Sequence, residues 1–377
     1  MTILQNSLAK KSVDNIMKIL IVNPIIYTSE TKNISRAKSI KDTMIYDLCL
    51  AFLQNGDEVT LATAEDFKPT QTEEYPFAVI WMKTRFKSIC PVNSLPYCPE
   101  IKRIAKSTAF DCIITSEVFS LNSLMLSMHS RKNLIVWHEL GKHNKIFHGI
   151  ASRFWYGVIA RLCFKNTLIV PRSPQAKKFI SQYCRNVSDI IIDHGVNLDK
   201  FTFTADKGNY FAVSSQLIKR KRIDKILAAF ADYLKKYDGT AKLYIMGDGD
   251  EKQNLENEVK RLNICDSVVF TGRLMHSELE KRLAHAMAML VYTEKDNNMI
   301  SIVESIAVGT PVLTTTVPYN ASYITEYGLG IADDNWNCDT LKEITDKKYI
   351  EACRKYREKI STKSKVELFY KAFDELK

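Results

Sequence analysis

The chain has 377 residues, of which 46% are hydrophobic and 25% charged, a composition typical of a soluble globular protein of two or three domains. Only 13 glycines and 10 prolines are present, which excludes collagen-like and low-complexity proteins. The 53 Lys and Arg outnumber the 43 Asp and Glu, for a net charge of +10. This excess favours an anionic partner: a nucleic acid, a phosphorylated small molecule or an anionic membrane face.

The chain begins with a polar tail, residues 1–16, which lacks the unbroken apolar core of a secretory signal. No apolar run approaches the ~18 residues that a membrane-spanning helix needs. The nine cysteines are an odd number and contain no C-x-x-C pair, which argues against a disulfide framework and a zinc ribbon. These features predict a cytoplasmic protein with reduced thiols.

Short apolar segments alternate with amphipathic ones in the first half of the chain. The expected strands are residues 17–24, 58–63, 77–82, 110–115, 133–137, 166–170 and 189–193. They are apolar throughout, which is typical of strands buried on both faces of a parallel sheet. The expected helices are residues 40–56, 120–129 and 173–184. This alternation predicts βαβ units in a doubly wound α/β sheet.

A polar stretch that ends in a glycine, residues 199–208, separates this series from a second one. The expected strands of the second series are residues 209–215, 241–249, 266–272, 287–293 and 311–316. Its expected helices are residues 222–237, 250–263, 276–286 and 299–309. The pattern therefore predicts two Rossmann-like doubly wound domains, followed by a charged helical segment.

Residues 294–316 are the most informative stretch. Asn297 and Asn298 suit the start and cap of a helix. Glu304 lies in that helix among apolar residues, where a buried carboxylate is costly without a partner. It lies either on a solvent-exposed stripe, or in a structural ion pair, or facing a cleft where it accepts hydrogen bonds from ligand hydroxyls. Asp296 is either a simple first-turn acid or part of a ligand site at the helix entrance.

Asp296, seven intervening residues and Glu304 resemble the E-x7-E signature of the retaining glycosyltransferases of family four. Five further stretches resemble elements of that family in the same order: residues 17–24, 194–201, 215–224, 246–249 and 268–274. The resemblance implies the GT-B architecture, in which two Rossmann-like domains face a cleft. It also implies a polar tail at 1–16, an acceptor domain at 17–200, a nucleotide-sugar domain at 201–349, and C-terminal helices at 350–377 that return to the first domain.

The resemblance implies roles for individual residues. Lys221 stands where the family binds the donor diphosphate, and a cation suits a leaving group that gains negative charge. Glu304 stands where an acid binds the ribose hydroxyls, and Asp296 where the first glutamate holds the donor sugar. His138 follows a strand, as the family's active-site histidine does. Backbone contacts with the base are implied at Gly272, Arg273 and Leu274. For two of these residues a purely structural role is the alternative. Lys221 lies in a basic run typical of a solvated face, and His138 could be a packed core residue.

The chain departs from the family pattern at three places. The diphosphate-binding arginine is replaced by Gln216, and the nearby cations are Lys219, Arg220 and Arg222. Asp296 is one methylene shorter than the usual Glu, and the residues that follow it in the expected donor site are Asn297, Asn298 and Met299. The glycine-rich acceptor loop is replaced by residues 23–39.

The predicted function is transfer of a hexose from a nucleoside-diphosphate sugar to a glycan or lipid-linked acceptor with retention of anomeric configuration, in surface polysaccharide or glycoconjugate synthesis. No cofactor beyond the donor and no metal are expected, because helix amides and Lys221 would neutralise the phosphates. The alternative is a non-catalytic protein of the same fold that binds a nucleotide sugar and partners an active transferase. A nucleic-acid-binding function rests on charge alone and has no supporting motif.

Residues 145–166 mix Lys, Arg and aromatic side chains with apolar ones at helical spacing. This pattern is typical of a helix that lies in an anionic membrane surface. The alternative is a helix that packs against the first domain's sheet. The sequence thus leaves two predictions open, peripheral contact with the inner face of the membrane and a buried helix.

Overall fold

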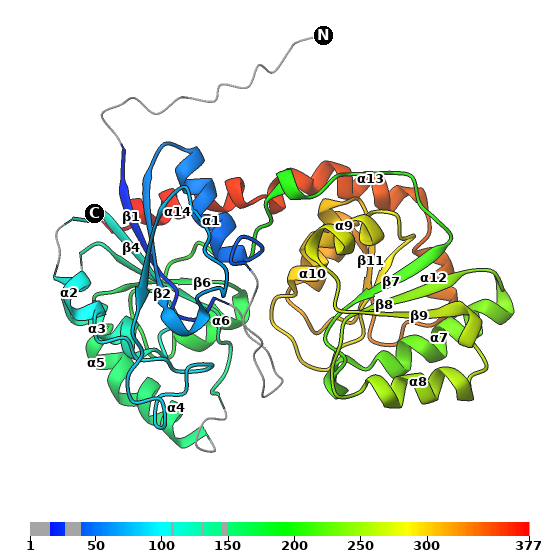
Figure 1. The fold of residues 1–377 in the computed structure, drawn as a ribbon, viewed down its shortest axis with the longest axis horizontal. Helices are drawn as coiled ribbons and strands as arrows, with labels where there is room; N and C mark the ends of the chain where they lie inside the picture. The colour runs from blue at the N-terminus through cyan, green and yellow to red at the C-terminus, as the bar shows by residue number, and fades with distance from the viewer. Residues whose placement is uncertain (1–15, 27–38, 107–108, 130–131, 145–148, 377) are drawn as a thin grey trace, which may run out of the picture.

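The structure is a computed structural model that describes residues 16–26, 39–106, 109–129, 132–144 and 149–376. Two α/β domains lie beside each other along the long axis of the molecule (Figure 1). Each domain is built on a six-stranded sheet whose neighbouring strands pair in parallel. The α/β fold class with two doubly wound domains, predicted from the sequence, is therefore confirmed.

The first domain takes its sheet from the N-terminal half of the chain, with the strand order β3-β2-β1-β4-β5-β6. Its strands are β1 (Lys18–Val22), β2 (Glu58–Ala64), β3 (Ala78–Met82), β4 (Cys112–Ser116), β5 (Leu134–His138) and β6 (Leu168–Pro171). Its helices are α1 (Met44–Gln54), α2 (Ile101–Ala105), α3 (Leu121–His129), α4 (Ile150–Phe154), the π-helix η4 (Trp155–Ala160), α5 (Arg161–Cys163) and α6 (Pro174–Ile180). Every residue of β5 is buried, as expected for an inner strand covered on both faces.

The second domain repeats this plan with the strand order β12-β11-β10-β7-β8-β9. Its strands are β7 (Tyr210–Ser214), β8 (Lys242–Met246), β9 (Val268–Gly272), β10 (Met289–Leu290), β11 (Val312–Thr314) and β12 (Gly330–Ala332). Its helices are α7 (Ile223–Lys236), α8 (Lys252–Arg261), α9 (His276–Ala284), α10 (Ile300–Ala307), α11 (Asn320–Tyr327), α12 (Cys338–Glu343) and α13 (Lys347–Tyr356).

Two glycines fix the turn that follows β8. Gly247 and Gly249 have φ angles of +154° and +159°. A Cβ atom on Gly247 would lie 1.8 Å from the carbonyl oxygen of Ser215, and one on Gly249 would lie 2.4 Å from that of Leu217. Only glycine allows this approach, so these residues let the turn after β8 pack closely against the loop after β7.

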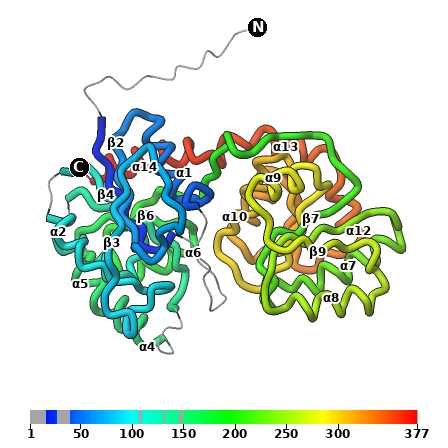
Figure 2. The backbone as a smooth tube through the Cα atoms, in the orientation of Figure 1, coloured from blue at the N-terminus to red at the C-terminus, as the bar shows by residue number. Residues whose placement is uncertain are grey.

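The chain crosses between the domains twice. The two crossings run together, because the Val196 N–H donates to the Ile360 carbonyl and the Thr362 N–H donates to the Val196 carbonyl, at 3.0 and 2.8 Å. After the second crossing, α14 (Thr362–Asp374) packs against α1 of the first domain. Figure 2 shows this red segment passing from α13 beside the second domain to α14 beside the first. The C-terminal helix therefore belongs to the first domain's packing.

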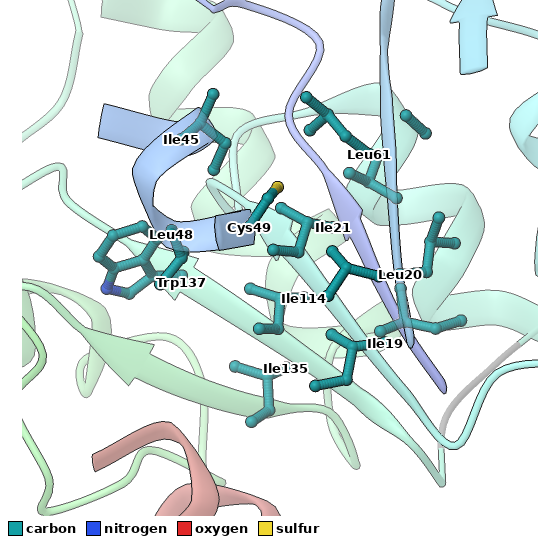
Figure 3. Close-up of a cluster of buried hydrophobic side chains, with 14 of the residues drawn as sticks. Ile19, Leu20, Ile21, Ile45, Leu48, Cys49, Leu61, Ile114, Ile135 and Trp137 are labelled. Carbon is teal, nitrogen blue, oxygen red and sulfur yellow. The ribbon is translucent and has the colours of Figure 1, made fainter. Parts of the chain in front are cut away.

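The core of the first domain lies between its sheet and the helices α1 and α14. Figure 3 shows part of it, with side chains of β1, β2, β4, β5 and α1 meeting around Cys49. From α14, the Phe369 ring lies 5.8 Å from that of Phe52 and 5.2 Å from that of Trp137. These aromatic contacts join the last helix of the chain to the middle of the first sheet.

The structure differs from the expected elements in several places. Residues 189–193, expected as a strand, form no strand, because the carbonyl of Ile192 accepts a hydrogen bond from the Trp137 indole at 2.7 Å. The short elements α2, β12, α11 and α12 were not predicted, because each is too short or too polar to give a periodic apolar signal.

Candidate active site in the interdomain cleft

A cavity of about 520 Å³ opens between the two domains. Among the charged residues of its first-domain wall, Glu117, Glu139 and Arg172 directly follow β4, β5 and β6. In open α/β sheets the carboxyl ends of the strands are the usual position of a ligand site. The second domain contributes His276 and Glu304, among others. The cavity therefore lies where both sheets can present side chains to one ligand.

Glu139 has two basic side chains as close neighbours, Arg172 and His194. The Arg172 Nη1 atom lies 3.0 Å from Glu139 Oε2, and His194 Nε2 lies 3.6 Å from Oε1. Burial alone would raise the pKa of Glu139, but His194 and Arg172 lower it to about 2. The Arg172 guanidinium also lies over the Trp137 ring, 3.6 Å from its centroid. These contacts keep the carboxylate charged and in place over the whole physiological pH range.

His138, predicted as an active-site residue, is the last residue of β5 and is fully buried. Its ring stacks with Phe179, at a centroid distance of 6.3 Å. Its Nδ1 atom lies 2.9 Å from Glu117 Oε2, without the alignment of a hydrogen bond. His138 therefore lies behind the cavity wall, which is formed by Glu117 and Glu139. A role of His138 in the reaction stays a prediction.

Glu117 is a wall residue that the sequence reasoning missed. Its φ angle of +67° lies in the left-handed region, which is costly for a residue other than glycine and often marks functional sites. Its Oε1 atom accepts a hydrogen bond from the Glu139 N–H at 2.7 Å. The only sequence signal for Glu117 and Glu139 is that each follows a buried strand.

Glu304 enters the cavity from α10 of the second domain. Its neighbours Ile302, Val303 and Ile306 are fully buried, whereas the Glu304 side chain keeps 13% of its surface exposed. The His276 Nε2 atom lies 3.8 Å from Glu304 Oε1. Glu304 thus has His276 as a neighbour and also lines the cavity, while its binding of ligand hydroxyls stays a prediction.

Stability at the His276–Glu304 contact should depend on pH. The interaction with Glu304 raises the pKa of His276 above 6.5, although burial opposes the shift; Asp42 adds to the rise and Lys200 reduces it. A raised pKa means that protonation stabilises the folded state below pH ~6.5 and that this contribution is lost as the pH rises through the folded-state value. We therefore expect His276→Gln to lower the free energy of unfolding more at pH 6 than at pH 9. Urea unfolding at both values measures this difference, and an equal loss at both would contradict it.

Asp296 lies between two cations at the entrance to α10. Its Oδ2 atom is 2.8 Å from Lys221 Nζ, and its Oδ1 atom is 2.7 Å from Arg220 Nη1. The Thr293 hydroxyl also donates to Oδ2, at 2.5 Å. Burial would raise the pKa of Asp296, but Lys221 and these hydrogen bonds lower it. Lys221 is thus a buried ion-pair partner of Asp296, and its position is not that of a solvated basic run.

The cations near Gln216 have different surroundings. Arg220 reaches Asp296, whereas Arg222 pairs with Asp224 and Glu294 at 3.0 and 2.5 Å. Lys219 is exposed. Arg220 therefore lies beside Lys221 and Asp296, whereas Lys219 and Arg222 do not. Of these three cations, Arg220 is the one placed to substitute for the arginine that Gln216 replaces.

Asn297 and Asn298 connect the two domains. The Asn297 amide donates to the carbonyl of Glu139 at 2.6 Å, and the Asn298 amide donates to that of Arg172 at 3.1 Å. The expectation that they cap the helix was wrong, because α10 has Met299 at its N-cap without a side-chain cap. The Met299 N–H instead donates to the Asn320 side chain, at 2.6 Å. Asn297 and Asn298 thus contact the first-domain loops that follow β5 and β6, whose residues Glu139 and Arg172 line the cavity.

Of the predicted site residues, Asn298 and Glu304 line the cavity, whereas Lys221, Asp296 and the others do not. Gly272 ends β9, and its carbonyl accepts a hydrogen bond from the Gly247 N–H at 2.9 Å. Arg273 is exposed and Leu274 is half-buried, directly after β9. Gln216, in the loop after β7, is also half-buried. Of the unusual loop at 23–39, residues 27–38 lie outside the described residues, whereas Asn23 and Ile26 line the cavity.

The described residues contain no group of three or more His, Cys, Asp or Glu side chains placed to hold a metal ion. None of their helices combines the length and the apolar character needed to cross a membrane.

Several solved structures share the fold over nearly the whole chain. Sucrose-phosphate synthase from Thermosynechococcus elongatus has a TM-score of 0.67 at 16% identity, covering 96% of this chain and 99% of that one. Anabaena HepE in complex with UDP and glucose has a TM-score of 0.64 at 12% identity, covering 95% and 100%. This likeness covers both α/β domains, and the architecture of the chain is GT-B.

Sequence comparison identifies the second domain more narrowly. Residues 197–367, which include nearly all of the second domain, match the family model of the glycosyl transferases group 1. The chain is 29% identical over 251 residues to an alpha-monoglucosyldiacylglycerol synthase of Streptococcus pneumoniae, covering 60% of this chain and 56% of the relative. It is 34% identical over 103 residues to an N-acetyl-alpha-D-glucosaminyl L-malate synthase of Bacillus anthracis, covering 27% and 26%. The chain thus spans just over half of the first relative.

Proposed function

We propose that the protein is a retaining glycosyltransferase that moves a hexose from a nucleoside-diphosphate sugar to a glycan or lipid-linked acceptor without a metal ion. The observation that carries the proposal is that Glu304 faces the interdomain cavity from a helix within the residues that match the group 1 family model. The relatives support it, since one is named as a synthase of a glucosylated diacylglycerol and one solved structure holds UDP and glucose. A role in surface polysaccharide or glycoconjugate synthesis, in the cytoplasm, is part of this proposal.

In this proposal the second domain holds the donor. Glu304 accepts hydrogen bonds from the ribose hydroxyls. Lys221 and Arg220 exchange part of their interaction with Asp296 for the diphosphate, and Asp296 orients both cations. The bond between the anomeric carbon and the β-phosphate oxygen breaks, and the acceptor hydroxyl oxygen forms the new bond on the same face. The hydroxyl proton passes to the departing phosphate, whose negative charge the two cations stabilise.

Glu304→Gln should weaken UDP binding about 10- to 150-fold, because a hydrogen bond to a charged acceptor contributes about 1.5–3 kcal/mol. Isothermal titration calorimetry with UDP measures the change, after a thermal-shift screen of UDP, GDP, ADP and dTDP has identified the base. Glu278→Gln is the matched control, since Glu278 is an exposed first-turn acid of α9 outside the cavity. Equal affinities for Glu304→Gln and the parent would contradict the assignment of Glu304 to the ribose.

A second candidate is a nucleotide-sugar-binding protein without transferase activity that partners an active enzyme. The observation that favours it is the pairing of both Arg220 and Lys221 with Asp296, in a site where Gln216 replaces the arginine. The two candidates differ in turnover. A transferase releases nucleoside diphosphate slowly from its bound donor even without an acceptor, whereas a binding protein returns the donor intact.

A further inference from the structure

A row of exposed apolar side chains follows the helical segment α4–η4–α5. Ile150, Phe154, Val158 and Leu162, spaced four residues apart, are 69%, 60%, 42% and 71% exposed. The opposite side of the segment is buried, where Trp155, Tyr156 and Ala160 join a hydrophobic cluster of the first domain. One face of this helical segment therefore packs on the domain, while the other presents these four apolar side chains to solvent. We call the row of Ile150, Phe154, Val158 and Leu162 the apolar stripe.

The π-helix keeps the apolar stripe on one side. In an α-helix, residues four apart are rotated about 40° past a full turn, so three such steps would carry the row about a third of the way around the helix. The i→i+5 bonding of η4 (Trp155–Ala160) winds the chain less tightly and offsets this rotation. All four side chains consequently remain exposed along a segment of fourteen residues, 150–163.

A second exposed apolar pair lies in the loop after β3. Phe86 and Ile89 are 67% and 66% exposed. Phe86 has a φ angle of +54°, an unfavourable conformation for an aromatic residue. The same loop is anchored beside the helix, because Leu95 packs against the hydrophobic cluster that contains Trp155. The exposed loop and the apolar stripe thus belong to neighbouring parts of one domain, at the end where Figure 1 shows α4.

Both segments come from stretches of sequence with one sign of charge. Residues 140–188 contain nine Lys and Arg but no Asp or Glu, and residues 75–99 contain three Lys and Arg but no Asp or Glu, although the whole chain has 43 acidic residues. Arg153, Arg161 and Lys165 flank the apolar stripe and are exposed. A surface of aliphatic and aromatic side chains with basic flanks fits the headgroup region of an anionic membrane.

We propose that the apolar stripe and the loop of Phe86 and Ile89 dock the protein on an anionic lipid surface. Phe154 and Leu162 enter the apolar boundary of the headgroups, while Arg153 and Lys165 contact lipid phosphates. A nucleic acid fits this surface less well, because exposed Ile, Val and Leu side chains gain nothing from a phosphate backbone. The inference rests on the first domain's surface and is independent of the proposed transfer reaction.

Flotation of the full chain with lipid vesicles tests the proposal. We expect binding to vesicles of phosphatidylcholine and phosphatidylglycerol in equal parts, none to phosphatidylcholine alone, and release at high salt. The double variant Phe154→Ser/Leu162→Ser should bind the mixed vesicles at least about tenfold more weakly than the parent, because neither position then buries an apolar side chain in the membrane. Val269→Ser/Tyr327→Ser is the matched control, since it removes two exposed apolar side chains from the second domain.

The charge contribution is tested by Arg153→Glu/Lys165→Glu, which should also reduce binding to the mixed vesicles. Circular dichroism melting shows whether each variant keeps the parent's fold, as expected for exposed positions. Failure of the parent to bind anionic vesicles would overturn the proposal, as would parent-like binding by folded Phe154→Ser/Leu162→Ser. Binding of single-stranded RNA that the same variants abolish, in place of vesicle binding, would assign the surface to nucleic acid.

Discussion

Lys221→Ala is expected to lower the turnover number about 100- to 1000-fold, the usual cost of removing one group that stabilises charge developing in a transition state. Its ammonium lies 2.8 Å from Asp296 in a buried site, so it is already oriented before a donor arrives. Donor binding should change much less, because the leaving phosphate gains its full charge only as the glycosidic bond breaks. Single-turnover kinetics measure the first effect, and calorimetry with the nucleoside diphosphate sugar measures the second.

The neighbouring cations separate this role from a general effect of charge. Lys219→Ala removes an exposed cation and should leave turnover unchanged. Arg220→Ala removes the second partner of Asp296 and should weaken donor binding, if Arg220 provides the charge that Gln216 lacks. A loss in Lys221→Ala confined to the Michaelis constant would contradict the proposed role of Lys221 in the transition state.

Phe369→Ala should destabilise the first domain by about 3–5 kcal/mol, the usual cost of replacing a buried Phe by Ala. The Phe369 ring is fully buried in contact with Phe52 and Trp137. Urea unfolding followed by tryptophan fluorescence measures the loss, because Trp137 reports on the first domain and Trp336 lies in the core of the second. Lys371→Ala, on the exposed side of α14, is the control and should change the midpoint little. Equal midpoints for the two variants would contradict a core role for α14.

The fold could be predicted from the sequence because inner strands such as β1 and β5 are almost entirely buried. Segments such as β1 and β8 are short, apolar runs with a β-branched residue, and each is followed by an amphipathic helix. Residues 189–193 have the same composition but form no strand, since the Trp137 side chain takes up the Ile192 carbonyl. Local patterns contain no information on such a contact between residues 55 positions apart.

The predicted residues that line the cavity, Asn298 and Glu304, both come from the second domain. Glu304 is a carboxylate in an apolar helix and therefore visible in the sequence. The prediction in the first domain fell on His138, whereas the adjacent Glu139 lines the cavity. Because successive residues of an extended chain point to opposite sides, a shift of one residue separates the buried side from the open one. The register that decides this is set by the pairing of β5 with its neighbours, which the sequence does not show.

The position of α14 has a consequence for synthesis of the chain on the ribosome. The last strand of the first sheet ends at Pro171, but α14 begins only at Thr362. Translation at ~5–20 residues per second therefore needs roughly 10–40 s to cross the interval. During that time the apolar sides of Phe52 and Trp137 lack the partner that later covers them. The nascent second domain can close around its own strands first, so the half of the protein that leaves the ribosome first is the last to complete its core.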